Sequence, residues 1–182
     1  MERRGWQVAV RSLPAVLHNR PQKIIILAER SVVRALDAGR TVALAYADCG
    51  TYGALDELCA RYGVRRLPGL HCYDVFAGAS RLAAMFEAEP GTYVLTDFLL
   101  RSFDRLVVTE LGLGRHPELW GDYFGHYRRL VWLAQEPTPA LEAEAERVAG
   151  LFGLPLTRLD TGLSRLESAL ADLVAEVTPW AA

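Results

Sequence analysis

The sequence predicts an α/β protein in which a mainly parallel sheet is flanked by helices, in the manner of a Rossmann-like three-layer sandwich. Two observations predict this class. Short β-rich runs alternate with helical patterns from end to end, and Gly or Pro stands at most junctions between them. The 182 residues are 51% apolar and contain no linker or low-complexity tract. One α/β domain over residues 1–182 is therefore expected.

The first half of the chain supplies three of the expected strands. Trp6–Leu13 alternates between apolar and polar residues as a half-buried strand does. Pro21 then opens a helix that Gly39 ends. Thr41–Ala47 is nearly all apolar, as expected for a central strand covered on both faces. A helix follows, and then the short strand Val64–Leu67.

The second half continues the alternation. A helical stretch from Tyr73 to Glu87 leads through a turn into the strand Thr92–Thr96, and Asp97 is a good N-cap for the next helix, which closes before Gly112. The remaining expected elements are a short aromatic helix after His116, a strand at Leu130–Ala134, a helix at Thr138–Phe152, a strand at Leu156–Leu159 and a C-terminal helix.

Composition and charge exclude several classes of function. A net charge of −2, with no basic stripe and interleaved aromatics, argues against nucleic-acid binding. No apolar run is long enough for a membrane span, and the N-terminus lacks the apolar core of a signal peptide. Three cysteines in such a chain suggest reduced thiols and a cytoplasmic protein. The chain has no Gly-rich phosphate loop and no GxSxG elbow, which disfavours a nicotinamide or ATP enzyme of the usual type.

Chemically capable side chains gather where the expected strands end. Ligands of open α/β sheets bind outside the carboxyl ends of the strands, so these residues are candidates for one shared site. The turn that precedes one strand adds Thr92 as a further candidate for contact with a cofactor. The candidates at the strand exits are His18, Asn19, Arg20, Asp48, Cys49, Gly50, Thr51, His71, Cys72 and Asp97.

Cys49 is the central candidate. It lies between a strand and a helix, where free backbone N–H groups and the helix dipole lower the pKa of a thiol. Such a thiol is a nucleophile or a metal ligand. The alternative is a small buried hydrophobe, because free cysteine is among the most buried residue types.

His71 and Cys72 adjoin each other in a loop after Pro-Gly, where both could reach one ion. With His18 and Cys49 they would make a Cys2His2 set suited to a metal ion, zinc above all. The spacing matches no compact zinc motif, so the fold must assemble this set. Separate hydrogen-bonding roles for the same residues are the alternative. Cys59 shares a helix face with apolar residues and is expected to be a core thiol.

Six sequence motifs, in a specific order, indicate a resemblance that covers almost the whole chain. The sequence resembles an uncharacterised prokaryotic family, domain of unknown function 1638. The resemblance implies an accessory role in corrinoid-dependent methyl transfer or one-carbon metabolism, because members accompany genes for that process, with corrinoid or methyltransferase proteins as expected partners. The motifs are LPAVLHNRP (13–21), YADCGT (46–51), LPGLHCY (67–73), EPGTYVLTDF (89–98), FDRLV (103–107) and LGLGRHPEL (111–119).

One departure from the family pattern lies at the N-terminus. Similar members begin with an additional strand and helix that carry a Cys-Gly near the strand end, and the residues from Met1 to Trp6 resemble the tail of that helix. The resemblance thus implies a first strand and helix missing from this chain, with a further cysteine upstream of Met1. A sheet edge left open in this way would favour a homodimer.

Three hypotheses for function follow, and whether the protein is an enzyme stays open. The leading one is a metal- or cofactor-binding site formed by Cys49, His71, Cys72 and His18, with zinc or a corrinoid as the associated group. The second is a metal-free enzyme with Cys49 as nucleophile, His18 or His71 as its base, and Asp48 or Asp97 orienting that base. The third is a non-catalytic module that binds a small molecule or a partner.

Overall fold

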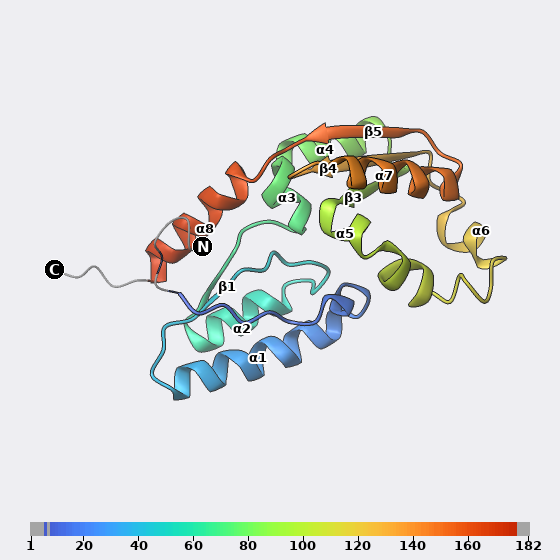
Figure 1. Ribbon diagram of the computed structural model, residues 1–182. Coiled ribbons are helices and arrows are strands. Elements are labelled where there is room, and N and C mark those ends of the chain that lie inside the picture. The colour runs from blue at the N-terminus through green and yellow to red at the C-terminus, as the bar shows by residue number, and fades with distance from the viewer. Residues whose placement is uncertain (1–5, 7, 178–182) are drawn as a thin grey trace.

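The computed structural model describes residue 6 and residues 8–177, which form two parallel sheets with helices around them (Figure 1). The expected α/β class is confirmed, but the described strands divide between two sheets. The N-terminal sheet pairs β1 (Ala43–Leu44) with β2 (Arg65–Arg66), and the C-terminal sheet has the order β3 (Thr92–Thr96), β4 (Arg129–Ala134), β5 (Leu156–Asp160).

Helices of very different length separate the strands. They are the 3-10 helix η2 (Ala15–Asn19), α1 (Pro21–Asp37), α2 (Ala54–Tyr62), α3 (Cys72–Ala77), α4 (Ala79–Ala88), α5 (Asp97–Arg101), the π-helix η3 (Asp104–Thr109), α6 (Leu119–Phe124), α7 (Pro139–Phe152) and α8 (Ser164–Val177). Figure 1 shows α1 and α2 beside the N-terminal sheet, whereas α4, α5 and α7 accompany the C-terminal sheet.

The C-terminal sheet is the better-buried of the two because β4 is covered on both faces. Leu130 and Trp132 pack into one core with residues of α5 and α7, whereas Val131 and Leu133 pack into a second core with residues of α3 and α4. Successive side chains of a strand point to opposite faces, so this alternation gives the three-layer arrangement that the apolar run at residues 130–134 predicts.

The N-terminal sheet has a shorter ladder and a smaller core. Ile24, Ala28 and Val32 recur at four-residue spacing along α1 and are buried, and the last two pack against Leu55 and Leu58 of α2. Only two residues of each strand are paired in regular fashion. The residues that follow these strands are therefore positioned mainly by turns and side-chain hydrogen bonds.

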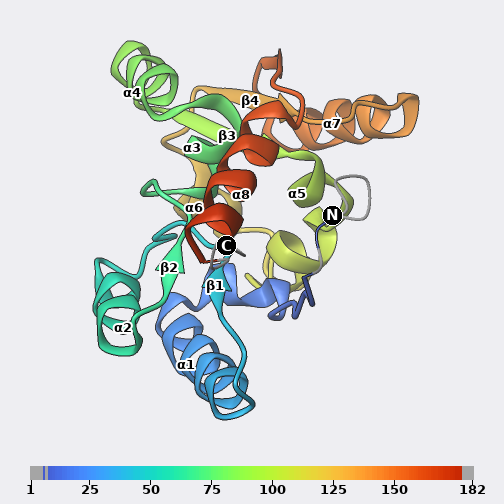
Figure 2. The same ribbon diagram turned by 90° about the vertical axis from the view of Figure 1, so that its left-hand side faces the viewer.

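Besides α3, which follows β2 and packs against β4, two contacts between distant segments join the halves of the molecule. Helix α8 leaves the carboxyl end of β5 and runs back to the N-terminal sheet, where its Leu173 packs with Leu67 and Val75 (Figures 1 and 2). At a second place η2 meets η3, because the Asn19 side chain donates a hydrogen bond to the Leu106 carbonyl oxygen.

Three expected elements differ from the structure. Residues 8–13 form no described strand, although their alternation predicts one. The expected helix Tyr73–Glu87 is divided into α3 and α4 at Gly78, whose φ of 87° is accessible mainly to glycine. The helix expected after Asp97 likewise breaks at Ser102 and continues as the π-helix η3.

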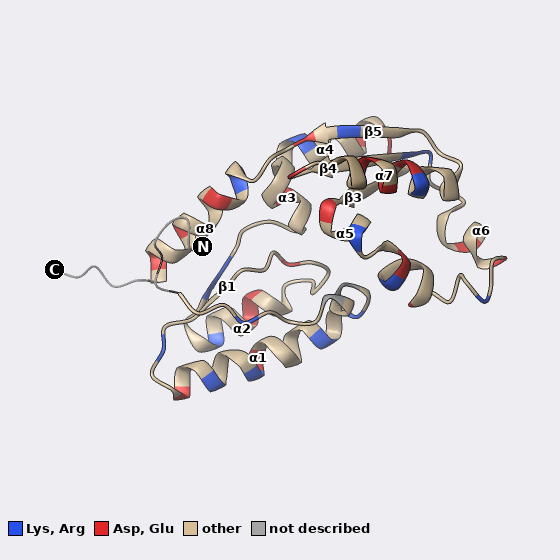
Figure 3. Cartoon of the chain, viewed as in Figure 1, with Lys and Arg blue, Asp and Glu red and all other residues tan. Residues whose placement is uncertain are grey.

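Charged residues of both signs are interspersed along α1, α7 and α8 (Figure 3). Such charged faces are typical of solvated helices. Among the described residues, no helix is both long enough and apolar enough to cross a membrane.

Candidate functional site

The turn after β1 is built around the carboxylate of Asp48, which is only 8% exposed. This carboxylate accepts three hydrogen bonds from the turn itself: from the Thr51 hydroxyl at 2.5 Å, from the Tyr52 backbone N–H at 2.9 Å and from the Gly53 backbone N–H at 3.0 Å. Burial raises the pKa of Asp48, but the hydrogen bonds from Thr51, Gly53 and Tyr52 outweigh it and lower the pKa below its ordinary value. A charged Asp48 therefore fixes the shape of the turn.

Left-handed backbone conformations recur in this turn. Cys49 has φ of 50° and Tyr52 has φ of 53°, and these are the non-glycine residues with positive φ in the described chain. An L-residue in this region costs about 1–2 kcal/mol relative to the right-handed form. Strain of this kind, held in place by surrounding hydrogen bonds, is characteristic of functional sites.

The turn after β2 lies alongside the first turn and leads into α3. The backbone N–H of Asp48 donates to Gly69, and that of Cys49 donates to Leu70, at 3.1 and 2.8 Å. The carboxylate of Asp74 accepts from the N–H groups of Leu70 and His71 at 2.7 and 3.0 Å. Each aspartate thus shapes its own turn, and the two backbone hydrogen bonds hold the turns together, which brings Cys72 to the turn that carries Cys49.

Cys49 and Cys72 line the same small cavity, and their thiols influence each other's pKa. The Cys72 thiol donates a hydrogen bond to the Cys49 sulfur, and a backbone N–H of Cys72 donates to the same atom. The thiol hydrogen bond is the largest effect on Cys49 and lowers its pKa to about 7, against desolvation and the nearby negative charge of Asp48, which raise it. The pKa of Cys72 is raised in turn because its proton is shared with the Cys49 thiolate.

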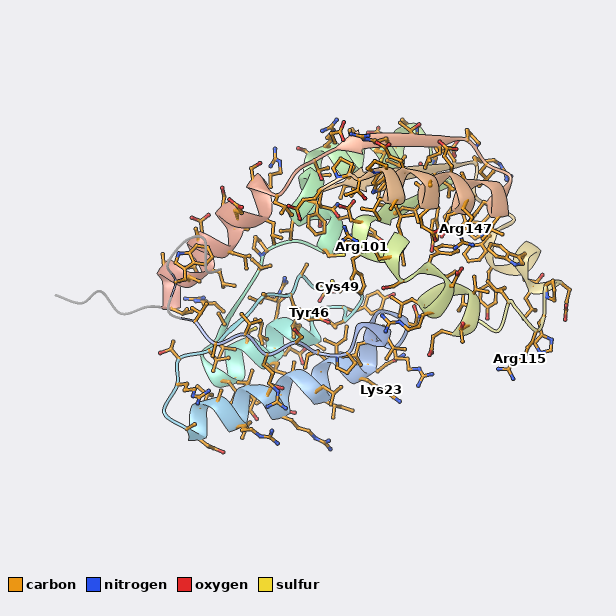
Figure 4. The ribbon with its side chains drawn as sticks, in the orientation of Figure 1. Lys23, Tyr46, Cys49, Arg101, Arg115 and Arg147 are labelled. Carbon is orange, nitrogen blue, oxygen red and sulfur yellow. The ribbon has the colours of Figure 1, made fainter. Side chains whose placement is uncertain are left out.

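A small cavity of about 190 Å³ opens beside the two sulfurs. Two of the residues that line this cavity, Tyr46 and Cys49, are labelled in Figure 4 and belong to the segment that follows β1. Burial and the neighbouring thiols raise the pKa of the Tyr46 hydroxyl, which therefore stays protonated beside the Cys49 thiolate. The lining is mostly apolar and consists of Ala45, Tyr46, Ala47, Cys49, Leu67, Cys72, Val75 and Phe76.

The described residues do not assemble the predicted metal set. His71 is exposed at the N-cap of α3 and stacks on the Tyr73 ring at 6.3 Å between centroids. His18 lies in η2, but its side chain is outside the described part of the structure. Across residue 6 and residues 8–177, no group of three or more His, Cys, Asp or Glu is arranged to hold a metal ion.

Other predicted site residues have structural partners. Asn19 and Arg20 connect η2 to η3, through the Leu106 carbonyl and through an ion pair with Glu110 at 3.2 Å. Thr51 is buried and engaged with Asp48. Gly50 lies in the turn with φ of 82°.

Asp97 and Thr92 lie at opposite ends of β3, since Thr92 begins that strand and Asp97 begins the helix that follows it. The N-cap of α5 is Thr96, whose hydroxyl accepts from the Leu99 N–H, so the N-cap prediction for Asp97 is wrong by one residue. The Asp97 carboxylate accepts from the Trp132 indole and from two backbone N–H groups at the exit of β4. Thr92 begins β3 and therefore sits at the amino end of that strand, away from the strand exits.

Sequence reasoning missed two contributors to the site. Tyr46 was counted only as part of an apolar strand, although it precedes Asp48 by two residues and contributes to the cavity. Asp74 was passed over as part of a helical stretch. Its position three residues after His71 is the spacing of a capping box, a signal that could have identified its role at the start of α3.

These features define the class of the protein: an α/β protein with two parallel sheets and a pair of contacting cysteines at the strand exits of the first. The chain belongs to the family described as "Protein of unknown function (DUF1638)", whose family model matches residues 12–170. The resemblance expected from the motifs is thereby confirmed. No curated protein and no solved structure gives a match.

Proposed function

We propose that this protein is a thiol-dependent α/β protein in which Cys49 reacts as a nucleophile with a small electrophile. The observation that carries the proposal is the placement of Cys49 and Cys72 on one cavity, where the Cys72 thiol lowers the pKa of Cys49 to about 7. At neutral pH about half of the Cys49 side chains are then thiolate, the reactive form. No histidine base is needed to remove the proton.

The cavity beside the sulfurs restricts the substrate. Its volume of about 190 Å³ lies below the ~300–1,000 Å³ of most sites for drug-sized ligands. Its walls are mainly aliphatic and aromatic, with the Tyr46 hydroxyl as a polar group. A short alkyl group fits this description better than a nucleotide or a sugar.

The reaction class is displacement at an electrophilic carbon. A bond forms between the Cys49 sulfur and that carbon, while the leaving group departs with its electron pair. Methyl transfer in corrinoid-linked one-carbon metabolism is the case that family membership suggests, and a methyl group has the right size and polarity. In this proposal a corrinoid or methyltransferase protein supplies the group, and Cys49 accepts it.

The test is the pH profile of alkylation at Cys49, measured with iodoacetamide and peptide mass spectrometry. The rate should rise with pH to a half-maximum near 7, because only the thiolate reacts. Buried Cys59 is an internal control and should react far more slowly, since it lies in the core between α1 and α2 and burial raises its pKa.

Variants of Cys72 test whether its thiol, and not the fold as a whole, lowers the pKa of Cys49. In Cys72→Ala the half-maximum should move upward toward the ~8.5 of an ordinary thiol, and the rate at pH 7 should fall about threefold, because a smaller thiolate fraction is partly offset by higher nucleophilicity. Cys72→Ser retains a hydrogen-bond donor, so its half-maximum should lie between those of the wild type and Cys72→Ala. An unchanged profile in folded Cys72→Ala would contradict the proposal.

Elemental analysis of protein purified without a metal-affinity tag tests the competing hypothesis. Stoichiometric zinc that disappears in both Cys49→Ala and Cys72→Ala would assign the thiol pair to metal binding and overturn the nucleophile proposal. Protein without stoichiometric metal whose Cys49 follows the profile above supports that proposal.

A further inference from the structure

We propose that Cys49 and Cys72 act together as a redox pair that reduces small-molecule disulfides by thiol–disulfide exchange. The inference rests on the proposed nucleophilic role of Cys49 and extends it to a second substrate class. It assigns Cys72 a chemical role of its own, that of the resolving thiol.

The first support is the placement of the two sulfurs. Both cysteines line the same cavity, and each thiol is the largest influence on the pKa of the other. Backbone hydrogen bonds from Asp48 to Gly69 and from Cys49 to Leu70 hold the two segments together. Because the two segments are bonded to each other and both cysteines face one cavity, we infer that a disulfide can close between them, as widely separated thiols cannot.

The second support is the asymmetry within the pair. Cys72 is the hydrogen-bond donor and Cys49 the acceptor, so the negative charge resides on Cys49. The attacking thiol in exchange reactions works best with a pKa near the ambient pH. Cys59 belongs to a separate core and cannot compete as the resolving thiol.

The reaction balances without an added oxidant or metal. The Cys49 thiolate attacks one sulfur of the disulfide, which breaks the substrate S–S bond and releases one thiolate that takes a proton from water. Cys72 then loses its proton and attacks the Cys49 sulfur, forming the Cys49–Cys72 bond and releasing the second thiol. The substrate gains two electrons, and the cysteine pair loses two.

The cavity selects among disulfides. Its small volume and mainly apolar walls accommodate a short neutral group on the sulfur under attack. Bis(2-hydroxyethyl) disulfide should therefore react faster than oxidised glutathione, which is larger and charged. Equal or reversed rates would contradict this role of the cavity.

The deciding experiment treats the fully reduced chain with bis(2-hydroxyethyl) disulfide and follows products by intact mass and peptide mapping. The wild-type chain should lose two hydrogens, release two equivalents of mercaptoethanol and yield a linked Cys49–Cys72 peptide. Cys72→Ser should stop at a mixed disulfide on Cys49 with one equivalent released. Cys59→Ser, the matched control, should behave as the wild type does.

The outcomes distinguish the two proposals. A stable mixed disulfide on Cys49 of the wild-type chain would overturn the redox pair and leave the nucleophile intact. A wild-type Cys49 that reacts with neither disulfide nor iodoacetamide would overturn both. The linked peptide from the wild-type chain decides the question even where a Cys72 variant fails to fold.

Discussion

A buried aspartate follows each of the strands β1 and β3, and the two aspartates have different structural roles. Asp48 and Asp97 are 8% and 3% exposed, and each carboxylate accepts three hydrogen bonds. The donors to Asp48 lie three to five residues along the chain, whereas the donors to Asp97 lie 35 to 39 residues away. One aspartate shapes a turn, and the other fastens two strands together.

The surroundings of the two residues explain this division. Asp97 joins β3 to β4 inside the largest core, where the Trp132 indole is 1% exposed and needs an acceptor. Asp48 follows a strand with only two regularly paired residues, so the sheet does little to position the turn. A strained turn that presents a reactive cysteine thus depends on local hydrogen bonds more than on the sheet.

The largest effect on stability is expected from Asp97→Ala. The substitution leaves the indole N–H of Trp132 and the N–H groups of Gln135 and Glu136 without their acceptor, which should cost about 3 kcal/mol of unfolding free energy. Asp97→Asn keeps one carbonyl oxygen and should cost less. Denaturant unfolding at neutral pH measures both.

Asp104→Ala is the matched control for this prediction. Asp104 is exposed on η3 and pairs with Arg147, so its loss should change stability by less than ~1 kcal/mol. Asp97→Asn should leave the Cys49 alkylation profile unchanged. If a folded Asp97→Asn chain had an unreactive Cys49, Asp97 would belong to the functional site, as the sequence predicts.

Asp48→Asn is expected to lower stability by less than Asp97→Ala does, and also to lower the pKa of Cys49. An amide replaces a carboxylate that accepts three hydrogen bonds, which should cost about 1–2 kcal/mol. Removing the negative charge of Asp48 should lower the pKa of Cys49 further, so the alkylation midpoint should move below 7. The pH profile of alkylation and denaturant unfolding measure these two effects.

Acid unfolding gives an independent check on Asp48. Because the folded state lowers its pKa, the charged carboxylate contributes stability above the unfolded value of about 3.9, and this contribution is lost as pH falls through the folded value. Asp48→Asn should therefore lose less stability than the wild type in that range. Asp56→Asn, an exposed control on α2, should not shift the Cys49 midpoint, and an upward shift in Asp48→Asn would refute the electrostatic assignment.

The same contrast shows which parts of the fold are readable from sequence. Alternating strand and helix patterns predict the α/β class because periodicity records which faces are buried. Periodicity does not record the pairing partner, so it cannot show that the strands divide between two sheets. Residues 8–13 alternate as a strand does but form no described strand, because a strand also needs a neighbouring strand to pair with and alternation does not supply one.

The candidate site was predictable only where its contacts are local to strand exits. Cys49 and Cys72 follow consecutive strands of one sheet, and the rule that ligand sites gather at strand exits brings them together. The partners of Asp97 lie on another strand, and its structural role was invisible without the fold. Thr92 begins β3 as the sequence predicts, and it therefore lies at the opposite end of that strand from the strand exits.

The smallest effect, and one of opposite sign, is expected from Tyr52→Gly in the turn that Asp48 shapes. Tyr52 is 95% exposed with φ of 53°, so glycine would relieve a left-handed conformation without removing packing. Strain relief, reduced by the greater freedom of glycine in the unfolded chain, should raise stability by up to about 1 kcal/mol. Tyr52→Ala keeps the strain and should show no such gain in denaturant unfolding. A loss of stability in Tyr52→Gly would mean that the tyrosine itself supports the turn, whereas a gain would show that Tyr52 is held in its left-handed conformation at a cost to folding.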